Sequence, residues 1–111
     1  MERLMKGDLV VVSFPFSNYK EVKKRPALVA ATLKGNDVIL CQITSEPYHD
    51  HYSIVLRDNE LKQGRLKWNS LILADKLFTT EKTRIDYKIG SLKEHKIKEV
   101  EKEIIKIFRN N

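Results

Sequence analysis

The chain has 111 residues, of which 41% are hydrophobic and 32% charged, which fits one globular domain and is too short for two. We therefore treat residues 1–111 as a single domain. Its net charge of +6 favours a polyanionic partner, such as nucleic acid or an acidic protein. The sequence has no apolar run of transmembrane length and no signal-peptide segment, so we expect a cytoplasmic protein.

The first half of the chain predicts three β-strands. Residues 9–14 form a hydrophobic run, which we expect Pro15 to end because proline cannot donate a backbone hydrogen bond. Residues 27–32 predict the second strand. A turn at residues 35–37 is expected to start the third strand at Val38.

The second half predicts three further strands. They are residues 53–56, residues 70–75, whose continuous apolar run indicates burial on both faces, and residues 87–89. Short strands at close spacing, with turn residues between them, predict a small β-barrel.

The hydrophobic pattern changes period near the C-terminus. Apolar residues recur there every three or four positions: Ile97, Val100, Ile104, Ile107 and Phe108. This pattern predicts an amphipathic helix that covers one end of the barrel. Ser91 and Glu94 have the spacing of a capping box, which would start the helix near Ser91.

Arg25 has the best-defined setting of the basic residues. Because Pro26 pushes the residue before it toward an extended conformation, Arg25 should be held at the mouth of the second strand. A fixed guanidinium with several N–H donors suits a phosphate. The alternative is that Arg25 is one of 21 basic residues on a solvated surface.

Two hydroxyl residues, Thr44 and Ser45, follow the third strand. If the second and third strands pair antiparallel across the turn at Gly35, their far ends lie together. Arg25 is ten residues before Gly35 and Thr44 nine after it, so we expect Arg25 and Thr44 to be neighbours. The two hydroxyls are equally well explained as groups that cap a strand end.

Other catalytic and metal-binding patterns are weak. The single cysteine, Cys41, lies in an apolar run and is expected in the core rather than as a nucleophile. His49-Asp50-His51 invites a metal-site interpretation, but on a polar segment it is more often a solvated loop. We expect no metal and no cofactor, and keep His51 as a candidate for proton transfer.

The motifs of this sequence, taken in order, resemble the MazF/PemK family of toxins from type II toxin–antitoxin systems. They are Gly7-Asp8, Phe14-Pro15-Phe16, Arg25 to Val29, Gln42 to Ser45, Gly64 to Lys67 and Ser70 to Thr79. The Phe-Pro-Phe motif indicates an FPF-containing PemK-like subgroup. The resemblance implies a mainly β fold with a C-terminal helix, as a small SH3-like barrel of the MazF/PemK/CcdB type. It also implies a helix start near Lys93, which we favour over the capping box.

The resemblance implies an endoribonuclease toxin, because the residues that match Arg25 and Thr44 carry the cleavage in MazF-like ribonucleases. The substrate would be single-stranded RNA (mRNA), cut at short motifs without metal when a 2′-hydroxyl attacks the adjacent phosphate. We expect Arg25 and Thr44 to stabilise the charge that develops on the phosphoryl oxygens. A cognate antitoxin and a homodimer are the implied protein partners.

Further residues are expected to bind the RNA: Phe16, Lys24, Ser45, Asp75 and Lys76. Asp75 and Lys76 match the family motif, and alternatively form a rim ion pair that contributes little. Bases of single-stranded RNA stack on aromatic rings, for which the candidates are Phe16, Tyr19, Tyr48 and Tyr52. Phe16 is equally well explained as a core or dimer contact.

Two other functions stay open on the same fold. One is a non-catalytic inhibitor that resembles the CcdB-type toxins, which block DNA gyrase by protein contact. The other is a barrel that binds RNA without cutting it. Arg25 with Thr44 favours the enzyme, because a protein-directed inhibitor needs neither of them at a strand end.

Overall fold

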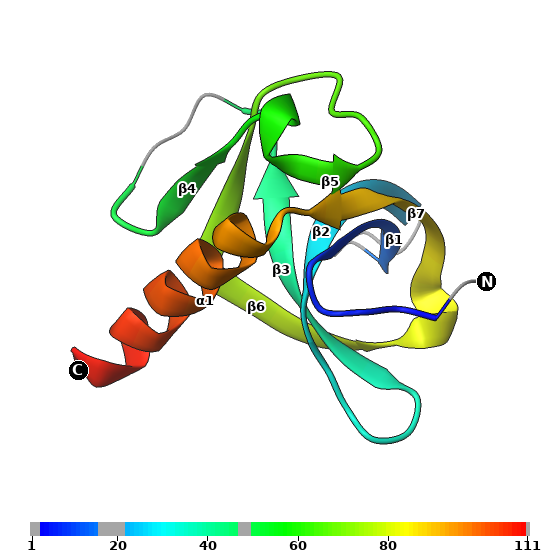
Figure 1. The fold of residues 1–111 in the computed structure, drawn as a ribbon. Helices are drawn as coiled ribbons and strands as arrows, with labels where there is room; N and C mark the ends of the chain where they lie inside the picture. The colour runs from blue at the N-terminus through cyan, green and yellow to red at the C-terminus, as the bar shows by residue number, and fades with distance from the viewer. Residues whose placement is uncertain (1–2, 16–21, 47–49, 111) are drawn as a thin grey trace.

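The computed structural model describes residues 3–15, 22–46 and 50–110, which form one curled antiparallel sheet and a C-terminal helix (Figure 1). The strands are β1 (Asp8–Pro15), β2 (Val22–Thr32), β3 (Asp37–Thr44), β4 (Ser53–Leu56), β5 (Leu61–Gln63), β6 (Ser70–Glu81) and β7 (Ile85–Leu92). Two 3-10 turns, η1 (Asp58–Glu60) and η2 (Lys82–Arg84), precede β5 and β7, and the helix is α1 (Glu94–Arg109).

The strands lie in the order β4-β6-β3-β2-β1-β7-β5, so that β4 and β5 form the two edges of a half-barrel. All paired neighbours are antiparallel. This arrangement confirms the expected mainly β fold with a C-terminal helix. Within the described residues, no helix has the length and apolar character needed to cross a membrane.

The two faces of the sheet bury different parts of the hydrophobic core. Leu9 and Leu28 pack into the part that also contacts α1, whereas their neighbours Val10 and Val29 pack into the other part. Successive side chains of a strand point to opposite faces, so an unbroken apolar run is buried on both sides. The run at residues 71–74 is buried throughout, as its sequence predicts.

Strand β2 begins five residues earlier than the sequence indicates. Residues 22–26 pair with β1, with Arg25 opposite Val12 and Pro26 opposite Val11. A proline is tolerated here because the pairing of β2 with β3 begins only at Ala27, so no second neighbour uses the missing N–H. Pro15 likewise closes β1 as its last residue instead of lying beyond it.

Other boundaries also differ from the sequence prediction, and one strand was missed. β6 continues to Glu81 and β7 spans residues 85–92, because pairing with β3 and β1 extends both strands beyond their apolar runs. β5 was not predicted, since three residues are too few to show a hydrophobic period. β3 begins at Asp37, one residue before its expected start, and it ends with Thr44, which the sequence analysis placed after the strand.

The helix begins where the family resemblance implies. β7 ends at Leu92, Lys93 is the N-cap residue and Glu94 starts α1, so the proposed capping box at Ser91 does not form. Val100 is buried, and the isoleucines of the stripe pack against the core. Phe108 is the exception, since its side chain is 71% exposed.

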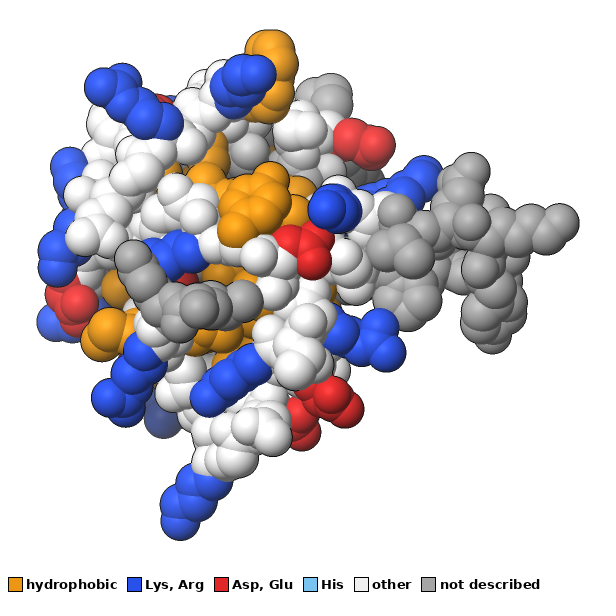
Figure 2. Space-filling view, turned by 90° about the vertical axis from the view of Figure 1, so that its right-hand side faces the viewer, with side chains coloured by type: hydrophobic (Ala, Val, Ile, Leu, Met, Phe, Trp, Pro, Cys, Tyr) orange, Lys and Arg blue, Asp and Glu red, His pale blue; other side chains and the backbone are white. Residues whose placement is uncertain are grey.

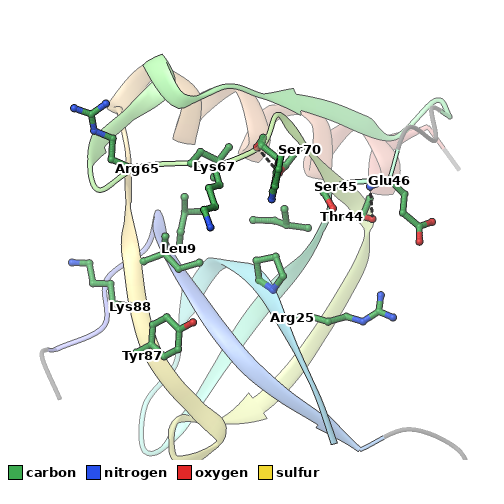
Figure 3. A pocket seen from close by; sticks show the side chains of 15 residues that line it. Leu9, Arg25, Thr44, Ser45, Glu46, Arg65, Lys67, Ser70, Tyr87 and Lys88 are labelled. Atoms are coloured by element: carbon green, nitrogen blue, oxygen red, sulfur yellow. Dashed lines mark hydrogen bonds between the residues drawn. The ribbon is translucent and has the colours of Figure 1, made fainter.

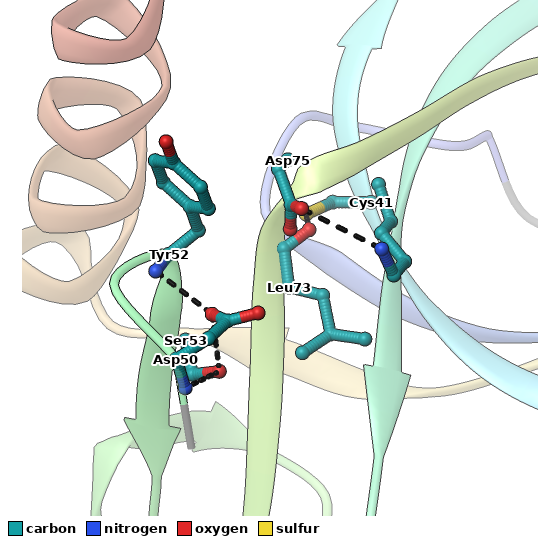
Figure 4. Close-up of polar contacts among 7 residues, drawn as sticks. Cys41, Asp50, Tyr52, Ser53, Leu73 and Asp75 are labelled. Carbon is teal, nitrogen blue, oxygen red and sulfur yellow. Dashed lines mark hydrogen bonds and ion pairs between the residues drawn. The ribbon is translucent and has the colours of Figure 1, made fainter. Parts of the chain in front are cut away.

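β6 contains a bulge between its two pairings with β3. Cys41 lies opposite Leu77 and Ile43 opposite Ile72, so residues 73–76 span a gap that Gln42 alone spans on β3. The Cys41 thiol donates a hydrogen bond to the Leu73 carbonyl oxygen at 2.9 Å (Figure 4). It thereby satisfies a backbone group that the bulge removes from the ladder.

Cys41 is a core residue, as the sequence predicts, and its side chain is fully buried. Burial, with a smaller contribution from the charge of Asp75, raises the pKa of its thiol to about 12. The thiol therefore stays protonated at neutral pH and is a poor nucleophile.

Lys96 ties α1 to the turn that precedes β5. Its Nζ lies 2.9 Å from Glu60 Oε2 and 3.0 Å from Glu99 Oε1, and its side chain is only 4% exposed. Partial burial opposes the ionisation of Glu60. However, hydrogen bonds from Lys96 and the Arg57 backbone N–H, with the charges of both residues, outweigh burial and lower the pKa of Glu60.

This ion pair should make folding stability depend on pH. Because the pKa of Glu60 is below 4.5 in the folded state, the pair contributes fully above that value and less as the pH falls through the folded pKa. Lys96→Met leaves Glu60 without its cation, and should lower the free energy of unfolding at pH 7 by about 1–3 kcal/mol. Urea unfolding at pH 7 and pH 3 measures both effects.

The matched control is Lys106→Met, which removes an exposed pair with Glu103 at 3.5 Å on the same helix. This substitution should lower the free energy of unfolding by less than about 1 kcal/mol. Equal losses in the two variants would contradict the role assigned to Lys96.

Candidate functional site

A cavity of about 980 Å³ opens beside the ends of β2 and β3 (Figure 3). Four segments supply most of its lining: Arg25 and Pro26 on β2, residues 43–46 at the end of β3, residues 65–68 between β5 and β6 with Ser70 at the start of β6, and residues 87–89 on β7. These segments are far apart in the chain, and the curl of the sheet brings them together.

Arg25 and Thr44 line the same cavity because β2 and β3 pair antiparallel. Ala27 lies opposite Gln42, so Arg25 and Thr44, each two residues further along, continue that register. Figure 3 shows both residues on one side of the cavity, together with Ser45 and Glu46. The two residues predicted as neighbours from the turn at Gly35 therefore line one cavity, and their joint role stays a prediction.

Arg25 lies within a strand and not at its mouth, which corrects the sequence interpretation. Pairing with Val12 holds its backbone, while its side chain is exposed. Lys23 and Lys24 are also part of β2, although the sequence predicts that this strand begins only at residue 27. Lys24 does not line the cavity, and its Nζ lies 3.3 Å from Asp86 Oδ2.

The Thr44 hydroxyl has a structural contact that leaves its proton available. Thr44 Oγ1 accepts a hydrogen bond from the Glu46 backbone N–H at 3.2 Å, which closes a tight turn after β3. A hydroxyl that accepts one hydrogen bond can still donate its own proton to another oxygen. Capping the strand end and binding an anion are therefore compatible roles for Thr44.

Cations dominate the lining of the cavity. Arg25, Arg65, Lys67 and Lys88 line it, and among the described lining residues Glu46 is the one carboxylate. In the view of Figure 2, Lys and Arg side chains surround a central group of hydrophobic ones, and acidic side chains are fewer. The cavity therefore suits an anionic ligand.

An ion pair with a buried carboxylate holds the Lys88 side chain in place. Its Nζ lies 3.3 Å from Oδ1 of Asp8, whose side chain is almost completely buried. The other oxygen of Asp8 accepts a hydrogen bond from the Met5 backbone N–H at 2.8 Å. The position of Lys88 on the cavity wall therefore depends on a buried carboxylate in β1.

The loop between β5 and β6 is fixed at both ends. Gly64 has a φ of 84° and packs so closely on β7 that a Cβ atom would collide with a backbone carbonyl there. The Leu66 backbone N–H donates to Asp58 Oδ1 at 2.6 Å, and Ser70 Oγ donates to the Trp68 carbonyl oxygen at 3.1 Å. The basic side chains of this loop are therefore presented from a defined backbone.

Two aromatic residues of the cavity were not among the sequence candidates. Trp68 and Tyr87 line it and are 69% and 55% exposed. A signal for Trp68 was present, since it is the single tryptophan and follows Lys67 in a polar stretch. No comparable signal distinguished Tyr87, because hydrophobic and polar residues alternate too weakly along its strand.

The other candidates lie elsewhere. Asp75 and Lys76 sit on the β6 bulge, outside the cavity lining, with Lys76 Nζ 3.5 Å from Asp75 Oδ2. His51 and Tyr52 line a separate cavity of about 260 Å³ against α1. Four candidates fall outside the described residues: Phe16, Tyr19, Tyr48 and His49. In the described part of the chain, no three His, Cys, Asp or Glu residues are grouped to hold a metal ion.

Solved structures share this fold. A toxin, MazF-mt6 of Mycobacterium tuberculosis, has a TM-score of 0.69 and 17% identity over 93% of this chain and 96% of that chain. An endoribonuclease from a Mycobacterial species, in complex with its cognate antitoxin, has a TM-score of 0.73 and 10% identity over 98% of each chain. A MazE-MazF structure from Deinococcus radiodurans has a TM-score of 0.71 and 18% identity over 93% of this chain and 94% of that chain.

The sequence profile of one family covers nearly the whole chain. This profile, described as the PemK-like, MazF-like toxin of type II toxin–antitoxin systems, matches residues 5–108. A comparison with curated proteins finds no significant match. On the extent of the profile match, the chain belongs to the PemK-like, MazF-like family of type II toxin–antitoxin toxins.

Proposed function

We propose that this toxin is an endoribonuclease that cleaves single-stranded RNA, including mRNA, at short sequence motifs without metal. The observation that carries the proposal is the single cavity that Arg25 and Thr44 line together with further cations. Structures of the same fold include proteins named as endoribonucleases, which supports an RNA-cleaving role.

The proposed reaction is an internal transesterification. An RNA 2′-oxygen loses its proton and bonds to the adjacent phosphorus, while the bond from phosphorus to the 5′-oxygen breaks and that oxygen takes up a proton. The products carry a 2′,3′-cyclic phosphate and a 5′-hydroxyl. Negative charge gathers on the phosphoryl oxygens in the transition state, where Arg25 and Thr44 donate hydrogen bonds.

The other cavity residues would hold the substrate. Ser45 is adjacent to Thr44 and offers a second hydroxyl to a phosphate. Arg65, Lys67 and Lys88 line other parts of the cavity and attract the RNA backbone. Four other RNA-binding roles stay predictions, those of Phe16, Lys24, Asp75 and Lys76. Membership of the FPF-containing subgroup also stays a prediction.

A cognate antitoxin is the protein partner that we propose. The net charge of +6 suits an acidic segment. Such a segment can be disordered when free and cover a large surface when it folds on binding. Solved structures of the same fold include a toxin with its cognate antitoxin and a MazE-MazF assembly.

We also propose a homodimer. An apolar groove of about 430 Å³ runs between α1 and the sheet, with Phe108 and Ile105 exposed along it. Large apolar side chains exposed beside a groove are typical of a protein interface. A second copy of this chain is the occupant that we propose.

Wild-type protein should cut a long single-stranded RNA in the presence of EDTA and leave 5′-hydroxyl and cyclic phosphate ends. Gel analysis with end-specific kinase labelling measures both properties. Activity that EDTA abolishes and a divalent ion restores would contradict the metal-free mechanism. RNA binding without any cleavage would identify a binding barrel, and neither binding nor cleavage would favour a protein-directed inhibitor.

Arg25→Ala should slow single-turnover cleavage by about 100- to 1000-fold, because it removes a transition-state donor. The variant should melt like wild type, since Arg25 is exposed. Arg25→Lys should restore only part of the rate, because an ammonium keeps the charge but not the planar fork. Thr44→Val should also lower the rate while RNA affinity is largely retained.

The matched control is Arg84→Ala, which removes an exposed arginine outside the cavity and should leave the rate unchanged. If Arg25→Ala melts normally and cuts at the wild-type rate, the chemistry lies elsewhere.

Light scattering at micromolar concentration should give twice the chain mass of 13.0 kDa. Phe108→Glu places a charge on the apolar groove and should shift the mass toward the monomer. Lys102→Glu, an exposed position of the same helix, serves as the control and should stay dimeric. A monomeric wild type, or a dimer that tolerates Phe108→Glu, would contradict this interface.

A further inference from the structure

Trp68 and Tyr87 have no part in the cleavage proposed above, yet both line its cavity. Their side chains are 69% and 55% exposed, although burial would favour aromatic rings of this size. Tyr87 lies across the cavity from Arg25 and Thr44 (Figure 3). Two exposed rings thus share one hollow with the residues that would hold the reacting phosphate.

The backbone behind both rings is fixed. Trp68 belongs to the loop that Asp58 and Ser70 hold through hydrogen bonds at either end. Tyr87 lies in β7, paired with Val11 of β1. A ligand that stacks on these rings would therefore lose little binding free energy to ordering of the backbone that carries them.

Each of the two aromatic residues has a lysine as its neighbour in the sequence. Lys67 precedes Trp68 and Lys88 follows Tyr87, and both lysines line the cavity. Proteins bind single-stranded nucleic acid by stacking its bases on aromatic rings and by placing cations near its phosphates. A duplex keeps its bases stacked within the helix, so this surface favours a single strand.

We propose that Trp68 and Tyr87 form a stacking platform for the RNA bases that flank the phosphodiester held at Arg25 and Thr44. The proposal rests on the proposed nuclease function, which it extends to the path of the substrate. The rings hold bases, while Lys67 and Lys88 hold the phosphates between them. Trp68 and Tyr87 therefore act on binding and positioning, and Arg25 acts on the chemical step.

Trp68 provides its own probe, because it is the single tryptophan of the chain. A 2′-O-methyl RNA oligonucleotide lacks the attacking hydroxyl, so it can bind without being cut. Titration at one fixed salt concentration should quench the tryptophan emission to saturation. The same sequence annealed into a duplex should not quench it. Saturable binding by anisotropy, with unchanged tryptophan emission, would overturn the platform.

Alanine variants test both rings by an independent measurement. Trp68→Ala and Tyr87→Ala should each weaken binding of a fluorescein-labelled 2′-O-methyl oligonucleotide by about 5- to 150-fold. Trp68→Phe should keep most of the affinity, since it retains an aromatic face. Leu33→Ala is the matched control, because Leu33 is a large apolar side chain that is 41% exposed but does not line this cavity.

Cleavage kinetics separate positioning from chemistry. With cleavable RNA, the two platform variants should need more enzyme for half-saturation, while the single-turnover rate at saturation stays near that of wild type. Arg25→Ala should show the opposite pattern. Thermal melts check that each variant folds, and the wild-type fluorescence titration decides the question if a variant does not.

The outcomes distinguish this platform from the proposed nuclease function. If wild type cuts RNA but Trp68→Ala binds and cuts as well as wild type, the platform is wrong and the nuclease stands. If RNA quenches Trp68 but wild type never cuts, the nuclease is wrong and the surface is an RNA-binding one. If Trp68→Ala keeps its RNA affinity but loses antitoxin binding, the surface is a protein contact and the platform is overturned.

Discussion

Strand β2 pairs with β1 through its first half and with β3 through its second half, and both registers are set by core packing. Leu28 and Val29 pack into different parts of the core, on opposite faces of the sheet. A slip of one residue would exchange those faces and place apolar side chains in solvent. The same registers fix the backbone positions of Arg25, opposite Val12, and of Gln42, opposite Ala27, so the geometry of the cavity wall follows from the packing of the sheet.

The short turn η1 contacts both the helix α1 and the loop that lines the cavity. Its Glu60 pairs with Lys96 of α1, while its Asp58 accepts the hydrogen bond from Leu66 that holds the basic loop. Three residues thus connect α1 to the wall of the cavity that carries Trp68. An ion pair outside the cavity can in this way support the positions of side chains that line it.

Identity to the three solved structures described above is 10–18%, yet the fold is retained over nearly the whole chain. A fold can be retained at such low identity because cores tolerate extensive substitution when their volume and hydrophobic pattern are kept. Function then depends on the residues placed in the cavity, which must be argued from their own geometry. Here the lining combines Arg25 within β2 and Thr44 at the end of β3 with further cations and two aromatic rings from other segments.

The sequence by itself determined the features that depend on local order. Apolar runs located most strands, the three- and four-residue period located the helix, and counting from Gly35 placed Arg25 beside Thr44. Only the tertiary structure decided the features that depend on pairing between distant segments. Pro26 lies inside a strand because its second neighbour starts later, and the β6 bulge carries Asp75 away from the cavity. Trp68 and Tyr87 reach the same hollow as Arg25 through the curl of the sheet, and no local pattern records a contact between residues so far apart in the chain.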